Sequence, residues 1–200
     1  MSTTPTKPRG EYAKTARRRD EIVTAALTVF SSSGFVNASM SEIAKRSGLT
    51  LPGLRHHFES KLDLLQEVIF RRELDANEHL KGRIGIDLLR GLLEIADRDQ
   101  KDPGLTQMYA MLAAEATDPE HPANEYFRGR YDLVVDTVHR AFREAAEDGA
   151  LRPESDPAGL ARSYVALSDG LQLQALYRPG SFSQVQLTRE FLRQHLTVPL

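Results

Sequence analysis

Hydroxyl, guanidinium, imidazole and ammonium groups occur together in one short stretch of the sequence, residues 39–61. Groups of these kinds are the usual protein donors to the phosphates and base edges of nucleic acids. For contacts with phosphates the candidates are Ser39, Ser41, His57 and Lys61. For contacts with bases or their adjoining phosphates they are Thr50, Pro52, Gly53, Arg55 and His56.

Two short helices joined by a tight turn are expected to position these side chains. Ser39 can cap the first helix, and Glu42 follows it at the capping-box spacing. Gly48 can take the left-handed conformation that ends this helix. Thr50 can cap the second helix, whose first turn tolerates Pro52. This order is the pattern of a helix-turn-helix that inserts into DNA.

One further helix on each side completes a compact helical module. The earlier helix is expected to end at Gly34, and Ser60 with Asp63 can cap the later one. Phe35 and Phe58 are expected to lock the short helices together. The earlier helix has one apolar face at helical spacing, formed by Ile22, Ala25, Ala26, Val29 and Phe30. Caps and glycine turns are common in helical proteins, so a packing unit without DNA contact is the alternative.

Charge is distributed unevenly along the chain, although the net value is only -2. Residues 1–60 carry nine Lys/Arg and five Asp/Glu, whereas residues 61–200 carry seventeen and twenty-three. We expect residues 1–14 to form a disordered basic arm. Three adjacent cations are unfavourable at the start of a helix, so we favour phosphate or minor-groove contacts over simple solvation there. These cations are Arg17, Arg18 and Arg19.

Residues 17–66 resemble the N-terminal domain of the TetR family of bacterial transcriptional regulators. The rest of the chain matches that family only in length and helical character. The resemblance implies an all-helical homodimer that binds double-stranded operator DNA through its N-terminal domain. It also implies a C-terminal domain that binds a small ligand and thereby releases the DNA. The matching residues are Ile22, Ala25, Ala26, Phe30, Gly34, Phe35, Ser39, Ile43, Ala44, Gly48, Leu49, Leu54, His57, Phe58, Ser60, Lys61 and Leu65.

One position departs from the family pattern. Arg55 stands two residues before the His57-Phe58 pair, where the family usually has an aromatic residue, most often Tyr, that touches the DNA backbone. An arginine at this position can hold a phosphate or bind the O6 and N7 atoms of guanine. The replacement therefore changes the kind of contact that is expected there, but not the expectation of DNA binding.

Composition disfavours several other classes of protein. The absence of cysteine excludes disulfides, thiolate metal sites and a cysteine nucleophile. No apolar run approaches the length of a membrane span and no secretory signal is evident, so we expect a cytoplasmic protein without a membrane partner. No catalytic or phosphate-loop motif is present, and adjacent His56 and His57 would point apart on a helix. We therefore expect no enzyme activity, no cofactor and no metal.

The remainder of the sequence predicts helices only, because its apolar residues recur at helical spacing. The expected helices cover about residues 61–79, 87–99, 105–117, 122–148, 158–177 and 183–196. The fold class is thus all-α with about nine helices. It consists of an N-terminal three-helix helix-turn-helix domain, residues 15–61, and a C-terminal helical bundle for ligand binding and dimerisation, residues 62–200.

Methionine and aromatic side chains in the C-terminal part suit a cavity that adapts to apolar ligands. A few polar groups accompany them, which favours a small, mostly apolar effector. A filled hydrophobic core is the alternative for the same residues. The pocket candidates are Leu92, Met108, Tyr109, Met111, Leu112, Tyr126, Phe127, Tyr131, His139, Phe142 and Gln172.

The helix expected over residues 158–177 is apolar on two faces, and such a helix must bury both. One face can pack on its own core and the other on a second copy of the chain, although both could also be internal. We place the homodimer interface on the last two helices. Its candidate residues are Tyr164, Leu167, Leu171, Leu187 and Phe191.

The leading hypothesis is a ligand-responsive repressor that binds a palindromic operator as a dimer and is released by its effector. A constitutive or architectural DNA-binding protein without ligand control is the second hypothesis, and a helical enzyme is the third. A cavity of more than a few hundred cubic ångströms in the C-terminal half would favour the first over the second. The operator sequence, the regulated genes, the effector and the choice between repression and activation do not follow from the sequence.

Overall fold

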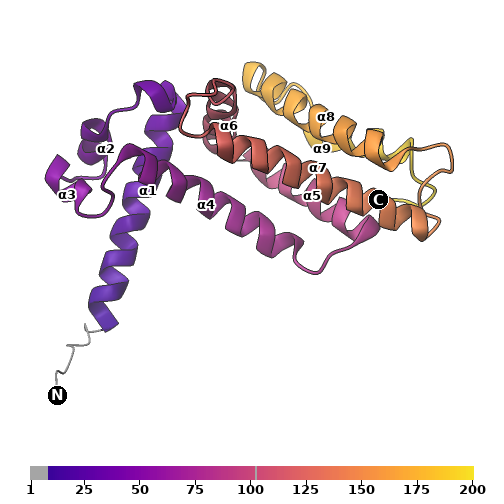
Figure 1. Ribbon diagram of the computed structural model, residues 1–200, viewed down its shortest axis with the longest axis horizontal. Coiled ribbons are helices and arrows are strands. Elements are labelled where there is room, and N and C mark those ends of the chain that lie inside the picture. The colour runs from indigo at the N-terminus through magenta and orange to yellow at the C-terminus, as the bar shows by residue number, and fades with distance from the viewer. Residues whose placement is uncertain (1–8, 102) are drawn as a thin grey trace. The chain divides into compact units, whose positions relative to one another are not determined.

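The structure is a computed structural model that describes residues 9–101 and 103–200, with side chains described from residue 14 onward (Figure 1). In these residues it contains nine α-helices and no strand beyond one isolated bridge, between Leu151 and Leu196. The all-α expectation is therefore confirmed. The chain forms two compact units, Met1–Arg72 and Glu73–Leu200, and the division falls inside a helix. None of the helices in the described part of the chain is long and apolar enough to span a membrane.

Helix α1 (Arg9–Asn37) begins earlier than the sequence predicts. Residues 9–14, expected to be disordered, form its first turns instead, whereas residues 1–8 of the expected arm lie outside the described residues. Gly34 ends the long regular part of the helix, as expected, because its φ of 73° and ψ of 176° are not helical. A short helical segment follows this kink up to Asn37. A kink is possible at this point because glycine adopts positive φ without a steric penalty.

The turn after helix α2 (Met40–Arg46) has the expected geometry. Gly48 has a φ of 67°, and the backbone N–H of Leu49 donates to the carbonyl of Ala44 at 2.8 Å. Bonds of this kind satisfy carbonyls that the end of a helix leaves free. The turn feeds helix α3 (Leu51–Arg55), where the hydroxyl of Thr50 accepts from the N–H of Gly53 at 3.3 Å. The cap predicted for Thr50 is confirmed.

Helix α4 (Lys61–Leu80) begins with the reciprocal cap that the sequence predicts. The N–H of Ser60 donates to the Asp63 carboxylate, and the N–H of Asp63 donates to the Ser60 hydroxyl, both at 3.0 Å. The capping box predicted for Ser39 is wrong, because its side chain makes no capping hydrogen bond. Glu42 pairs instead with Arg46 at 3.2 Å, one helical turn further along α2.

The first unit packs around a small apolar core that all of its helices share. Leu54 is the only residue of α3 that is fully buried, whereas α1 contributes a whole face. The rings of Phe30 and Phe35 pack with their centroids 5.9 Å apart. The buried core residues of this unit include Ile22, Ala26, Val29, Phe30, Phe35, Ile43, Leu54, Phe58, Leu64, Leu65 and Val68.

Beyond the end of α4, the described part of the second unit contains five further helices. These are α5 (Gly85–Lys101), α6 (Pro103–Glu115), α7 (Asn124–Glu147), α8 (Pro157–Tyr177) and α9 (Gln184–Arg193). Helix α7 packs against α5 and α8, and α9 packs against the same two helices. Side-chain oxygens of Asp156 and Ser183 accept from backbone N–H groups at the starts of α8 and α9. All five helices begin and end close to the positions that apolar spacing predicts.

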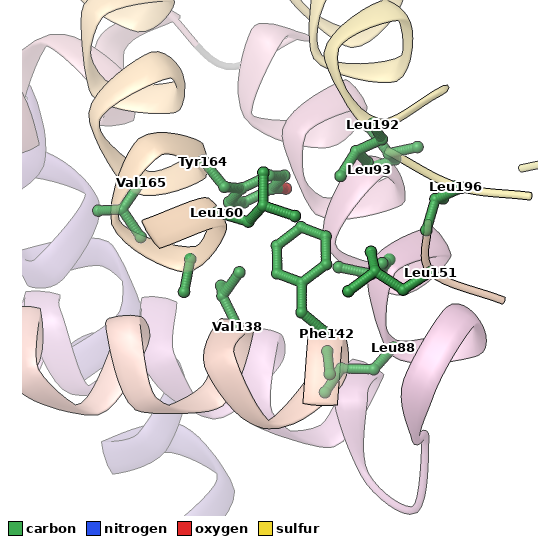
Figure 2. Close-up of a cluster of buried hydrophobic side chains, with 13 residues drawn as sticks. Leu88, Leu93, Val138, Phe142, Leu151, Leu160, Tyr164, Val165, Leu192 and Leu196 are labelled. Carbon is green, nitrogen blue, oxygen red and sulfur yellow. The ribbon is translucent and has the colours of Figure 1, made fainter. Parts of the chain in front are cut away.

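The core of the second unit is a single cluster of buried apolar side chains (Figure 2). Figure 2 shows Phe142 of α7 pointing into the space between Leu160 of α8 and Leu151, and Tyr164 lies in the same cluster. Phe142 is 0% exposed and Tyr164 is 5% exposed. Burial also raises the pKa of the Tyr164 hydroxyl. Phe142 is therefore core rather than pocket lining, and Tyr164 packs inside its own chain rather than against a partner.

Candidate DNA-binding site

Helix α3 presents one side to solvent while the other holds it to the first unit. Leu54 is 0% exposed and anchors the helix. Pro52, Arg55 and His56 are exposed, as is Thr50 at the N-cap, and Gly53 is half-buried. An α-helix that projects its side chains in this way can enter the major groove and reach base edges. The structure thus leaves open the face that the sequence assigned to bases.

A cationic groove lies beside α3 in the same unit. It has a volume of about 570 Å³ and is lined by Lys14, Thr15, Arg17, Arg18, Glu21 and His57. Arg17 is the most exposed of the three adjacent arginines, with 84% of its side chain accessible, and it pairs with Glu21 at 3.3 Å. Surface pairs of this kind are weak and exchange readily for a phosphate. The groove brings Arg17, Arg18 and His57 together, as a phosphate-binding surface requires.

The surroundings of His57, at the edge of this groove, favour its neutral form. Burial and the positive charges of His56, Arg19 and Arg18 all lower the pKa of His57. A neutral imidazole offers one N–H donor and one acceptor. His57 can therefore donate one hydrogen bond to a phosphate without carrying a charge. The rings of His56 and His57 meet edge to face with centroids 5.7 Å apart.

Lys61 does not have the role that the sequence suggested. Its ammonium group donates to the carbonyls of Phe35, Val36 and Ala38 at 2.7, 3.0 and 3.1 Å. It also lies 4.5 Å from the centroid of the Phe35 ring. An ammonium group has three donors, and these carbonyls account for all of them. In place of the phosphate contact expected from Lys61, the structure shows hydrogen bonds that join α4 to the end of α1.

Arg19 is also directed into the protein. Its guanidinium donates to the carbonyl of His57 at 2.8 Å and to the carboxylate of Glu67 at 3.2 Å, and it lies 4.2 Å from the centroid of the Phe58 ring. These three partners lie within the protein, so the geometry does not favour the DNA contact expected of Arg19. Sequence reasoning missed Glu67, because nothing local in the sequence signals a pair that is 48 positions apart.

Ser39 and Ser41 are both exposed near the start of α2. Neither side chain is drawn into the core, so both are accessible to a phosphate. The N-terminal end of a helix also leaves backbone N–H groups free for such a ligand. Their assignment as phosphate contacts stays a prediction.

In the second unit the expected pocket residues separate into groups. Tyr109, Tyr126 and Phe127 form an aromatic cluster, with ring centroids 5.1 Å apart for both pairs that include Phe127. Glu73 accepts from the Tyr126 hydroxyl and from Arg130, whose guanidinium lies 5.0 Å from the centroid of the Tyr109 ring. Met108 and Leu112 are buried, whereas Leu92, Met111, His139 and Gln172 are half-buried.

Tyr131 lies in a separate groove between α7 and α8, with a volume of about 410 Å³. Its hydroxyl donates to Asp169 at 2.9 Å. Burial and the neighbouring Asp169 carboxylate raise the pKa of Tyr131 to about 12. The groove is more polar than the sequence led us to expect. Its lining consists of Tyr131, Asp132, Val135, Asp136, Arg162, Val165, Ala166 and Asp169.

The exposed apolar residues of α8 and α9 differ in part from the residues expected at a dimer interface. Leu171 is buried at 6% exposure within its own chain, like Tyr164, whereas Leu167 and Phe191 are half-buried. Leu187 is 39% exposed. Leu173 and Tyr177, which were not among the expected interface residues, are 49% and 82% exposed. The outward stripe of α8 therefore runs through Leu173 and Tyr177.

Comparison with known proteins agrees with this geometry. Residues 22–68 match the model described as "Bacterial regulatory proteins, tetR family", and residues 87–197 match that of the "BetI-type transcriptional repressor, C-terminal". The HTH-type transcriptional regulator YfiR of Bacillus subtilis is 27% identical over 168 residues, which cover 80% of this chain and 81% of YfiR. UidR of Escherichia coli K12, another such regulator, is 27% identical over 173 residues, which cover 83% of this chain and 87% of UidR.

A solved structure shows the same fold. The crystal structure of NalD, the secondary repressor of the MexAB-OprM multidrug efflux pump in Pseudomonas aeruginosa, aligns with a TM-score of 0.69. The alignment has 21% sequence identity and covers 92% of this chain and 98% of NalD. Together the two family matches span most of both units and include the exposed helix-turn-helix. The chain therefore belongs to the tetR family of bacterial regulatory proteins and is a DNA-binding transcriptional regulator with a BetI-type C-terminal domain.

Proposed function

We propose that this regulator is a ligand-responsive repressor that binds a near-palindromic operator as a homodimer. The observation that carries the proposal is the solvent-exposed face of α3, with Arg55 and His56, beside the groove formed in part by Arg17 and Arg18. The exposed face of α3 suits base readout, and the cationic groove suits the adjoining phosphates. Operator DNA lies with the chromosome, so we place the protein in the cytoplasm.

The homodimer is supported by the apolar stripe on the last two helices. Leu173, Tyr177 and Leu187 are exposed in the single chain, and aromatic and aliphatic side chains of this kind gain most from burial against a partner. A second copy presents the same stripe, so the two surfaces pair isologously about a two-fold axis. A two-fold dimer requires half-sites about 34–36 Å apart, or a multiple of that spacing.

The effector is expected in the second unit. The aromatic cluster of Tyr109, Tyr126 and Phe127 offers apolar ring faces, and Glu73 and Arg130 add polar groups beside them. This combination suits a small, mostly apolar ligand with one polar group. Such a ligand would release DNA only if it bound more tightly to a dimer whose two DNA-binding units are spaced differently.

A regulator without ligand control is the second candidate. It is favoured by the packing of Phe142, an expected pocket residue that is fully buried in the core cluster. Calorimetric titration of candidate apolar compounds, repeated with selected operator DNA present, separates the two candidates. A compound that binds the protein and weakens its affinity for DNA supports the proposal, whereas compounds that bind without changing that affinity favour the second candidate.

The DNA-binding part is tested by selecting duplexes from a random-sequence pool and measuring their affinity for the protein at several salt concentrations. We expect the selected sequences to be near-palindromic, and Arg55→Ala to weaken binding about tenfold for each half-site, the discrimination typical of one arginine contact to a base. Arg98→Ala removes an exposed arginine of α5 and is the charge-matched control. Unchanged affinity and an unchanged salt dependence for Arg55→Ala would remove Arg55 from the site.

A further inference from the structure

Two adjacent arginines of α1 reach the ends of both helices of the helix-turn-helix. The guanidinium of Arg18 donates to the carbonyl of Ser47, the C-cap residue of α2, at 3.3 Å. The guanidinium of Arg19 donates to the carbonyl of His57, which directly follows the C-cap residue of α3, at 2.8 Å. The carbonyl end of a helix carries partial negative charge, so a cation at this position is favourable.

Arg19 is held from three directions. Besides the carbonyl of His57 it contacts the ring face of Phe58 and the carboxylate of Glu67 on α4. Its planar guanidinium has several donors in a fixed arrangement, which suits simultaneous binding to two acceptors. With 36% of its side chain accessible, Arg19 is far less exposed than Arg17. The side chain thus joins α1, the end of α3 and α4.

Glu67 is itself fixed by a second arginine. Arg71 donates to Glu67 at 2.9 Å and also pairs with Asp20 of α1. Burial acts to raise the pKa of Glu67, but the hydrogen bonds from Arg71 and Arg19 outweigh it and hold the pKa below its usual value. Glu67 is therefore a stable anion at neutral pH, and it gives Arg19 a fixed partner.

Helix α3 needs such an attachment. It has only five residues, a length at which an isolated helix is not stable in water. Leu54 is the only fully buried side chain within it, so its orientation also depends on how the chain is held just beyond its ends. An attachment at its C-terminal end fixes that orientation, and the exposed side chains of Arg55 and His56 then keep a fixed direction.

We propose that Arg19 is a positioning residue for DNA recognition: it sets the orientation of α3 through the His57 carbonyl and Phe58, and it contacts no phosphate. The proposal rests on the proposed function, in which α3 reads bases. It assigns different tasks to neighbouring arginines of α1. Arg17 supplies positive charge near the DNA backbone, whereas Arg19 fixes the orientation of α3.

The test compares two duplexes of equal length, one selected from a random pool by the wild-type protein and one unrelated in sequence. Arg19→Met keeps an unbranched apolar stem against Phe58 and removes the guanidinium. We expect it to weaken binding to the selected duplex about tenfold, by analogy with the loss of one well-oriented base contact. Binding to the unrelated duplex and the salt dependence of binding should both stay unchanged, because no phosphate contact is lost.

Arg17→Ala provides the contrasting variant. It should weaken binding to both duplexes and reduce the slope of the logarithm of affinity against the logarithm of salt concentration by about 0.9 for each copy of the chain on the DNA, about 1.8 for a homodimer. Arg19→Lys should fall between wild type and Arg19→Met, since one ammonium group cannot reproduce the two-acceptor fork. Glu67→Gln keeps the shape of its side chain and removes the charge, and it should lower the preference for the selected duplex less than Arg19→Met does.

Two results would overturn the proposal. A reduced salt slope for Arg19→Met, as for Arg17→Ala, would show a direct phosphate contact. An equal loss of affinity for both duplexes would show only that less of the protein is folded. The unfolding transition of each variant measures the folded fraction independently. If the wild-type protein selects no sequence at all, the proposed function fails instead, and that outcome is distinct from both.

Discussion

The two units of the chain are stabilised in different ways. In the first unit, α3 has five residues and buries one of them fully, so side chains from α1 and α4 must hold the recognition segment. In the second unit, α7 has 24 residues and buries a continuous face that includes Val138, Ala141 and Phe142. A long amphipathic helix is oriented by its own apolar face, whereas a short helix that must expose its polar face needs attachments from elsewhere.

Two cationic side chains of the first unit have a role that the surface ion pairs of the second unit do not have. Arg19 and Lys61 of the first unit bind the carbonyl ends of α3 and α1, so part of its positive charge is used internally. In the second unit, ion pairs such as Lys101–Asp97 and Arg83–Glu94 lie at the surface. Exposed pairs contribute little to stability. The comparison predicts that changes to the backbone and to charged side chains matter more for the recognition segment of the first unit than for the long helices of the second.

The largest effect is expected from Phe142→Ala. Phe142 is 0% exposed in the core cluster, and truncation of such a side chain costs about 3–5 kcal/mol of unfolding free energy. Leu133→Ala on the same helix is the control, since Leu133 is 60% exposed and its truncation should change stability by less than about 0.5 kcal/mol. Denaturant unfolding measures both variants. Similar losses of unfolding free energy for the two variants would contradict the conclusion that this cluster stabilises the protein.

The next largest effect is expected from a substitution in the exposed apolar stripe of α8. Tyr177→Glu places a charge where we expect a second copy to pack, and it should weaken dimerisation by about 2 kcal/mol, the cost of losing a central aromatic contact. Sedimentation velocity over a range of protein concentrations measures the dissociation constant. Ile84→Glu is the control, because Ile84 is 64% exposed and lies just before α5. Equal effects of the two variants would move the interface away from α8.

One glycine in each unit allows the same comparison for the backbone. Gly48 has a φ of 67°, and a methyl group added to it would meet only open space, so Gly48→Ala should cost about 1–2 kcal/mol through backbone strain alone. Gly129 lies inside α7, also with open space, and Gly129→Ala should stabilise the protein by up to about 1 kcal/mol through helix propensity. Thermal or denaturant unfolding reports both values. A stabilising Gly48→Ala would contradict the turn geometry.

The smallest effect is the pH dependence due to Glu67. Its pKa is lowered in the folded protein, so the unfolded chain binds more protons and the contribution of Glu67 to stability is present above the ordinary pKa of 4.5. That contribution is lost as the pH falls through the folded-state pKa. The difference in unfolding free energy between wild type and Glu67→Gln should therefore shrink on acidification from pH 6. Glu59→Gln, at an exposed carboxylate, is the control and should show a smaller change.

Features that depend on near neighbours in the chain followed from the sequence. The turn at Gly48, the cap at Thr50 and the reciprocal cap of Ser60 and Asp63 each involve atoms within four or five residues. The prediction at Ser39 failed for an equally local reason. Glu42 has two possible partners at helical spacing, and the structure pairs it with Arg46 rather than with the start of α2.

Tertiary structure decided which side of each helix is available. The two apolar faces of α8 are equivalent by spacing, but Tyr164 faces the core while Leu173 and Tyr177 face solvent. A periodic pattern fixes the angle between residues on a helix and leaves open what each side meets. The exposed apolar surface of α8 therefore lies part of a helical turn away from the expected dimer surface. Phe142 belongs to the core and not to the expected pocket.

The sequence by itself determined that the chain is all-helical, where its helices lie and which short segment carries the DNA-binding pattern. These depend on apolar spacing, caps and turn residues that act over a few positions. Only the tertiary structure decided that Arg19 and Lys61 have hydrogen-bond acceptors within the protein itself. Their partners are 23 to 48 positions away, and a cation binds whichever acceptor the fold brings within reach.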